Sequence, residues 1–153
     1  MSDFKLARIL APTDQSAFSQ KAIGYARDLA KHFGAELHVL RVMADEDKAL
    51  AQYAVTGIID AGPPGDDYNQ WLAELVGATG DVRRIESVQI AKDVPEAIAR
   101  YAKNHDIDMI VMATHGHTGL THLLMGSVAE KVMRSSPCPV LTLHPETLKG
   151  VFV

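Results

Sequence analysis

The sequence predicts an α/β fold built on a parallel β-sheet. Short apolar runs alternate with stretches whose apolar residues recur at helical spacing through most of the chain. This alternation is typical of parallel strands joined by helices that cover the sheet. The length of 153 residues suits one domain, and we find no internal repeat or linker that would divide residues 1–153.

The first elements are two predicted strands and the helix between them. Residues 6–11 and 37–43 are apolar runs, the first of them ended by Pro12. Apolar side chains from Phe18 to Phe33 recur at helical spacing after a turn that contains helix-capping residues. Gly34 stands where a C-terminal cap is expected.

The middle of the chain continues the alternation after a weakly patterned stretch. Residues 44–65 predict a variable loop, and a second helix is expected from Asp66 or Asp67 to Gly77. Residues 82–90 carry many polar side chains and predict a third strand near a sheet edge. Asp93, followed by a proline and a glutamate, predicts the start of the third helix.

The last elements surround a loop that contains glycines. Residues 107–113 form the most apolar run and predict an interior fourth strand. Gly126-Ser127 opens the fourth helix, where Ser127 and Glu130 match a capping box. Residues 140–143 predict the fifth strand, and a tail of residues 144–153 follows.

Right-handed crossovers favour the strand order 3-2-1-4-5 in an open sheet with helices on both faces. Strands one and four are then neighbours at the switch point, where ligands of such sheets bind beyond the carboxyl ends of the strands. Pro12-Thr13-Asp14, Val42 and the loop from Ala113 to Gly126 meet there. Asp14 could accept a hydrogen bond from a ribose or amino group, and the loop and helix start could hold phosphates. The alternatives are that Asp14 only caps the first helix and that Gly126-Ser127 only begins the fourth.

Three motifs together resemble the universal stress protein family over nearly the whole chain. They are Pro12-Thr-Asp14, the spacing Gly116-(nine residues)-Gly126-Ser127, and the closing Ser-Pro-Cys-Pro-Val of residues 136–140. The resemblance implies a Rossmann-like adenine nucleotide-binding fold with five strands, usually dimeric. It also implies that members with the full glycine loop bind ATP, here expected with Mg²⁺, while others bind no nucleotide.

The resemblance also assigns candidate contacts residue by residue. Asp14 is expected to contact the adenosine, Val42 the adenine through its backbone, and the loop and helix start the phosphates. The expected set is Pro12, Thr13, Asp14, Val42, Met112, Ala113, His115, Gly116, His117, Gly126, Ser127 and Val128.

The glycine loop departs from the family pattern at two positions. Ala113 replaces the first glycine, and at a positive φ an alanine would cost roughly 1 kcal/mol or more. His117 stands where relatives often have a cation. Because a histidine is mostly neutral at pH 7, we hypothesise that ATP affinity rises below its reference pKa of about 6.5.

Other classes of site are weakly supported. His115, His117 and His122 could ligate zinc, but their spacing matches no familiar metal pattern. There is no GxxxxGK[ST] motif and no evident nucleophile–base set, so we expect a protein that is not an enzyme. Cys138, the single cysteine, is expected to be a structural buried thiol.

The net charge and the distribution of apolar residues disfavour several classes of partner. A net charge of −4 without a basic block disfavours nucleic acid and anionic membranes. The N-terminus resembles no signal peptide, and no apolar run is long enough to span a membrane, so we expect a cytoplasmic protein.

Three functions remain open. The first is an ATP-binding regulatory protein of the stress response, the second a dimeric interaction module without nucleotide, and the third an enzyme of the wider adenine-nucleotide α-hydrolase type. A homodimer through the fifth strand and the apolar tail is expected, and a further protein partner is possible.

Overall fold

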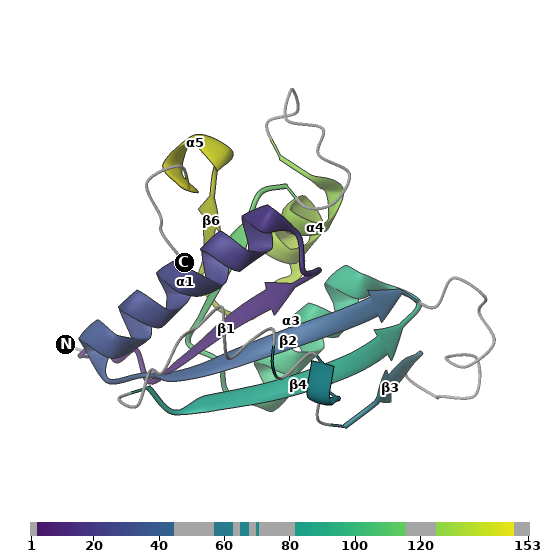
Figure 1. Cartoon of the computed structure of the whole chain (residues 1–153), viewed down its shortest axis with the longest axis horizontal. Coiled ribbons are helices and arrows are strands. Elements are labelled where there is room, and N and C mark those ends of the chain that lie inside the picture. The colour runs from purple at the N-terminus through teal and green to yellow at the C-terminus, as the bar shows by residue number, and fades with distance from the viewer. Residues whose placement is uncertain are drawn as a thin grey trace.

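The protein is described from a computed structural model, in which residues 3–44, 57–62, 65–67, 70, 82–115 and 125–148 are described. They contain a six-stranded sheet of order β3-β4-β2-β1-β5-β6 with helices on both faces (Figure 1). The chain order reverses between β1 and β5. Without β3, this is the predicted order 3-2-1-4-5.

All neighbouring strands are parallel except β3 and β4, which are antiparallel. The pairing of β2 with β4 is the longest in the sheet, and the pairing of β1 with β5 is the shortest. The strands are β1 Arg8–Thr13, β2 Glu36–Ala44, β3 Ile58–Asp60, β4 Arg84–Ala91, β5 Met109–Ala113 and β6 Val140–Leu143.

Local capping interactions fix the ends of the helices α1 (Ala17–Phe33) and α3 (Val94–Asn104). The Ser16 side chain accepts from the backbone of Ser19, and Gly34 closes α1 at φ 67°. Asp93 accepts from the backbone of Glu96 at the start of α3, as predicted. The remaining helices are α4 Ser127–Ser135 and α5 Pro145–Leu148.

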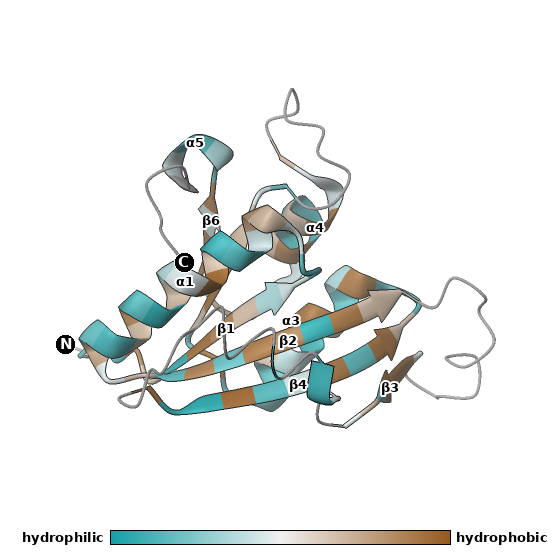
Figure 2. Ribbon diagram, viewed as in Figure 1, coloured by the Kyte–Doolittle hydropathy of each residue, from teal (hydrophilic) through white to brown (hydrophobic). Residues whose placement is uncertain are grey.

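The two faces of the sheet carry separate apolar clusters. On one face α1 packs over Ile9, Leu37 and Val39. On the other, α3 and α4 pack over Leu10, Leu40 and their neighbours. Because successive strand residues point to opposite faces, both clusters draw on β1 and β2. In Figure 2, apolar segments alternate with hydrophilic ones along β2 and β4, and α1 carries both hydrophilic and apolar stretches.

The prediction of a variable loop over residues 44–65, and of five strands in all, is wrong at residues 58–60. Residues 58–60 form β3, which pairs antiparallel with β4 at the edge of the sheet. Ala61 donates to the Val88 carbonyl, and Gly62 bends the chain at φ 79°. Three residues are too few to show an alternating pattern, so this strand depends on pairing with a distant partner.

The capping-box prediction for α4 is also wrong. Gly126 is the N-cap and makes no side-chain cap, so Ser127 is the first helical residue.

Phe33, at the end of the apolar stripe of α1, is 50% exposed. The predicted second helix lies largely outside the described residues, although Asp66, Asp67 and Gln70 are helical.

Candidate functional site

A crevice opens where β1 and β5 stop pairing. Their register covers only Ile9 with Met109 and Leu10 with Ile110. Beyond this point β1 continues beside β2 to Thr13, and β5 continues beside β6 to Ala113. The carboxyl ends of the two central strands therefore diverge at the switch point, where ligands of open α/β sheets bind.

Pro12 lies inside β1 and does not end it, contrary to the sequence-based prediction. The Arg8 carbonyl accepts from Asp108, so residue 8 faces β5, and residues 10 and 12 share that orientation. Because pairing with β5 has ended by residue 12, the N–H that proline lacks has no ladder partner to lose. Pro12 is thus compatible with an interior strand at this one position.

The crevice forms a pocket of about 240 Å³. Every predicted contact residue that the structure describes lines it: Pro12, Thr13, Asp14, Val42, Met112, Ala113, His115, Gly126, Ser127 and Val128. Gly116 and His117 lie outside the described residues. The tertiary structure thus brings together segments from β1, β2, β5 and α4, as the predicted topology requires.

Asp14 does not cap α1, so the alternative that it serves only as the helix cap is wrong. Ser16 is the cap, and Asp14 instead accepts a hydrogen bond from the Ser16 backbone at 2.9 Å through Oδ1. The side chain is exposed and borders the pocket. Gln15 has φ 63°, so the turn between β1 and α1 contains a left-handed residue beside the pocket.

Two buried hydroxyl groups stand beside Asp14. Thr13 Oγ1 lies 2.9 Å from Ser19 Oγ, which itself donates to the Ser16 carbonyl at 3.0 Å. Thr13 must therefore donate to Ser19, while it accepts from the backbone of Gln15. In this arrangement both hydroxyl protons are engaged, and the pair offers only acceptor capacity to a ligand.

Sequence reasoning missed Ser19 and several other lining residues, namely Val94, Ile98, Thr114 and Ala129. Ser19 follows the helix cap by three residues, which is a spacing that could have indicated its position near the crevice. Val94 and Ile98, on α3, both pack in the cluster beneath α3 and α4.

Gly126 packs against the end of β5. Its backbone N–H donates to the Thr114 carbonyl at 2.6 Å. A Cβ atom at Gly126 would lie 2.8 Å from that same carbonyl oxygen, which is closer than such atoms approach in folded proteins. The φ of −72° suits any residue, so the glycine is required by space and not by backbone conformation.

The first turn of α4 faces the pocket without a side-chain cap. Ser127, Val128 and Ala129 line the pocket, and the first N–H groups of a helix have no partner within the helix. These donors and the positive end of the helix dipole favour an anion at this end of the pocket. The chemistry suits a phosphate group.

Ala113 is accommodated without strain. It lies in β5 opposite Leu143, and the non-glycine residues with positive φ in the described part of the chain are Gln15 and Asp106. The cost considered for an alanine at positive φ therefore does not arise.

His115 is buried beside Thr114 and contacts the rings of Phe18 and His144. The Thr114 hydroxyl lies 2.8 Å from His115 Nδ1. His117 and His122 lie outside the described residues, and within those residues no group of three or more metal-ligating side chains occurs.

Comparison with known proteins assigns the family. The model of the universal stress protein family matches residues 5–144. This chain belongs to the universal stress protein family. A universal stress protein of Methanocaldococcus jannaschii, MJ0531, is 30% identical, with 89% of this chain and 81% of the relative covered.

Solved structures of universal stress proteins share the fold. One in complex with cAMP has a TM-score of 0.65 at 21% identity and covers 92% of this chain and 98% of its own. Another, from Archaeoglobus fulgidus in complex with dAMP, has a TM-score of 0.58 at 17% identity and covers 90% of this chain and 95% of its own.

Within the described residues, no helix is long and apolar enough to cross a membrane.

Proposed function

We propose that this universal stress protein binds an adenine nucleotide, ATP with Mg²⁺, in the switch-point pocket, and that binding regulates its contacts with partners. The observation that carries the proposal is the convergence of the predicted contact residues on one pocket between β1, β5 and the start of α4. Two structural neighbours are in complex with adenine nucleotides, which supports the ligand class.

The chemistry of the lining fits such a ligand. The exposed Asp14 carboxylate and the Thr13–Ser19 pair offer acceptors for ribose hydroxyl groups. Val42, Val94, Ile98 and Met112 offer apolar contacts to a base. The amides at the start of α4 would hold phosphate oxygens, and Mg²⁺ would neutralise part of their charge.

We propose binding without turnover. The described lining contains one carboxylate, Asp14, and one imidazole, His115, and the latter is buried beside Thr114 and the rings of Phe18 and His144. Sustained release of phosphate from ATP, dependent on Asp14 or His115, would contradict this part of the proposal.

Mass spectrometry of the denatured, freshly purified protein tests the proposal directly, by detecting ATP or AMP released from it. Calorimetric titration with MgATP should then show that Asp14→Ala weakens binding by about tenfold, as expected when a hydrogen bond to a charged group is lost. Asp28→Ala, which removes an exposed carboxylate on α1 away from the pocket, serves as the control. If no nucleotide is released and MgATP does not raise Tm, the chain is an interaction module without nucleotide.

We further propose a homodimer through β6. This strand lies at the edge of the sheet. The carbonyls of Pro139 and Leu143 accept from β5, so residues 140 and 142 direct their backbone groups to the open side. Thr142→Pro removes an outward N–H while leaving the pairing with β5 intact. Light scattering at micromolar concentration should give a dimer for the native chain and a monomer for Thr142→Pro; a native monomer would refute the proposal.

A further inference from the structure

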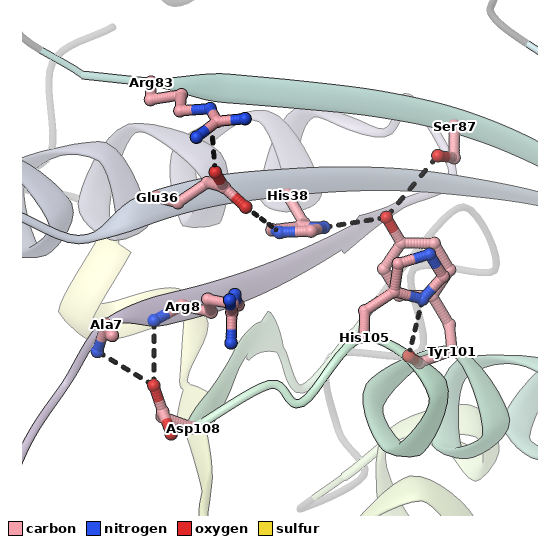
Figure 3. A network of polar contacts seen from close by, with 9 residues as sticks. All are labelled: Ala7, Arg8, Glu36, His38, Arg83, Ser87, Tyr101, His105 and Asp108. Atoms are coloured by element: carbon pink, nitrogen blue, oxygen red, sulfur yellow. Dashed lines mark hydrogen bonds and ion pairs between the residues drawn. The ribbon is translucent and has the colours of Figure 1, made fainter.

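A chain of polar side chains connects β2 to α3 (Figure 3). It lies on the face covered by α3 and α4, whose apolar cluster includes the pocket residues Ile98 and Met112. His38 Nε2 lies 2.7 Å from Glu36 Oε1, and His38 Nδ1 lies 2.8 Å from the Tyr101 hydroxyl. His38 and Tyr101 are both 2% exposed. At its ends, the chain meets Arg83, 2.9 Å from Glu36, and Ser87, 3.4 Å from the Tyr101 hydroxyl.

The chemistry of the groups fixes the direction of these hydrogen bonds. The Glu36 carboxylate is paired with Arg83 and can only accept, so His38 Nε2 carries the proton. Neutral His38 then accepts at Nδ1 from the Tyr101 hydroxyl. A second proton on His38 would place two donors at the 2.8 Å contact, so the Tyr101 hydroxyl would have to accept from His38 and turn its own hydrogen toward Ser87 Oγ, 3.4 Å away.

Burial favours the neutral imidazole. Loss of water around His38 lowers its pKa below 6.5, and this outweighs the opposing effect of Glu36. The other charged or titratable groups that act on His38 are His105, whose ring lies 5.8 Å away at the end of α3, and Arg8 on β1. Both act in the same direction as burial.

The same two elements form a wall of the pocket. On β2, His38, Leu40 and Val42 share a face, and Val42 lines the pocket. On α3, Tyr101 lies one turn beyond Ile98 and two beyond Val94, and both of these line the pocket. The contact between His38 and Tyr101 therefore joins α3 to β2 four residues before Val42 on the strand and one turn beyond Ile98 on the helix.

We propose that Glu36, His38 and Tyr101 are positioning residues for the pocket: they hold α3 at the distance from β2 that the ligand requires, and neutral His38 is the binding-competent form. The proposal rests on the proposed function. Since none of the three lines the pocket, they act through Val94 and Ile98 and not by touching the ligand. Acidification should therefore weaken binding through a group outside the site.

Tyr101→Phe tests the proposal with the least change of shape. We expect MgATP affinity at pH 7.5 to fall about 3- to 10-fold, within the range for residues that couple to a site without contacting it. The methyl resonances of Val94 and Ile98 should shift in the ligand-free protein. Tyr25→Phe is the matched control, because this half-buried tyrosine lies on α1 at the opposite face of the sheet.

The pH dependence gives a second readout. Lowering the pH from 7.5 to 5.5 should weaken MgATP binding through His38, opposite in sign to the effect hypothesised for His117, so the profile is measured in a His117→Gln background. In that background, His38→Gln should flatten this part of the profile. An unchanged slope in His38→Gln would assign the effect to another group and overturn the role of His38.

Two further outcomes separate the hypotheses. A lower Tm of Tyr101→Phe with unchanged affinity and unchanged methyl resonances would overturn the proposal and leave the network a purely structural role. A native chain that binds no nucleotide would overturn the proposed function, and the methyl resonances of the ligand-free variant would still decide whether the network positions the wall.

Discussion

Substitution of Gly126 by alanine tests the reasoning about the pocket most directly. The new Cβ atom would lie 2.8 Å from the Thr114 carbonyl oxygen, which belongs to the backbone and cannot turn aside. The start of α4 must move away by a few tenths of an ångström, and the 2.6 Å hydrogen bond between Gly126 and Thr114 is then strained or lost. No conformational penalty adds to this, because φ is −72°.

The magnitude follows from two terms. A lost backbone hydrogen bond costs about 1 kcal/mol, and insertion of a methyl group into a filled space costs about 1–3 kcal/mol. We therefore expect the free energy of unfolding to fall by about 2–4 kcal/mol, which lowers Tm by roughly 4–16 °C for a domain of this size. Because the amides at the start of α4 also shift, we expect MgATP affinity to fall by at least about tenfold.

Two other glycines separate the steric and conformational causes. Gly34 has open space around it but φ 67°, so Gly34→Ala should cost about 1 kcal/mol through backbone strain alone. Gly65 has open space and no positive φ, so Gly65→Ala should be within about 0.5 kcal/mol of the native chain. Differential scanning calorimetry and MgATP titration of all three variants provide the assay. Equal stability of Gly126→Ala and Gly65→Ala would refute the reasoning, as would an affinity loss shared by Gly34→Ala.

Three more predictions concern the side chains of Ser16, His38 and Cys138. Ser16→Ala removes the cap that accepts from the Ser19 backbone, and denaturant unfolding should show a loss of about 1 kcal/mol; an unchanged midpoint would contradict the assigned cap. Burial lowers the pKa of His38, so the unfolded chain binds more protons below about 6.5, and the free energy of unfolding should decrease as pH falls through that value. Unfolding of the native chain and of His38→Gln across pH 5–8 checks this, since the variant should lose that part of the slope. Burial also raises the pKa of the Cys138 thiol, so alkylation by iodoacetamide at pH 7.5 should be slower in the folded chain than in urea; equal rates would mean that the thiol is open to solvent.

Features that depend on neighbours in sequence could be predicted. The caps at Gly34 and Asp93 and the bounds of the strand at residues 140–143 agree with the structure, because each depends on local backbone conformation or on a short apolar run. The order of the parallel strands was also accessible, since right-handed crossovers leave few arrangements. The predicted contact residues in the described part of the pocket converge for the same reason.

Features that depend on distant partners could not be predicted. The three residues of β3 form a strand only because β4 offers an open edge, and Pro12 is tolerated only because β5 has already turned away. The capping box at Ser127 failed because the close approach of Gly126 to Thr114 decides where α4 begins. Likewise, the contact between His38 and Tyr101 joins residues far apart in the chain, and no local pattern encodes it.

The sequence by itself thus determined the alternation of strands and helices, the switch point and the residues around it, because these follow from periodicity and chain handedness. The tertiary structure alone decided how wide the crevice is and what holds its walls. That width depends on where the pairing of β1 with β5 ends and on how α3 is fastened to β2. Both are set by hydrogen bonds between segments that meet only in the folded chain.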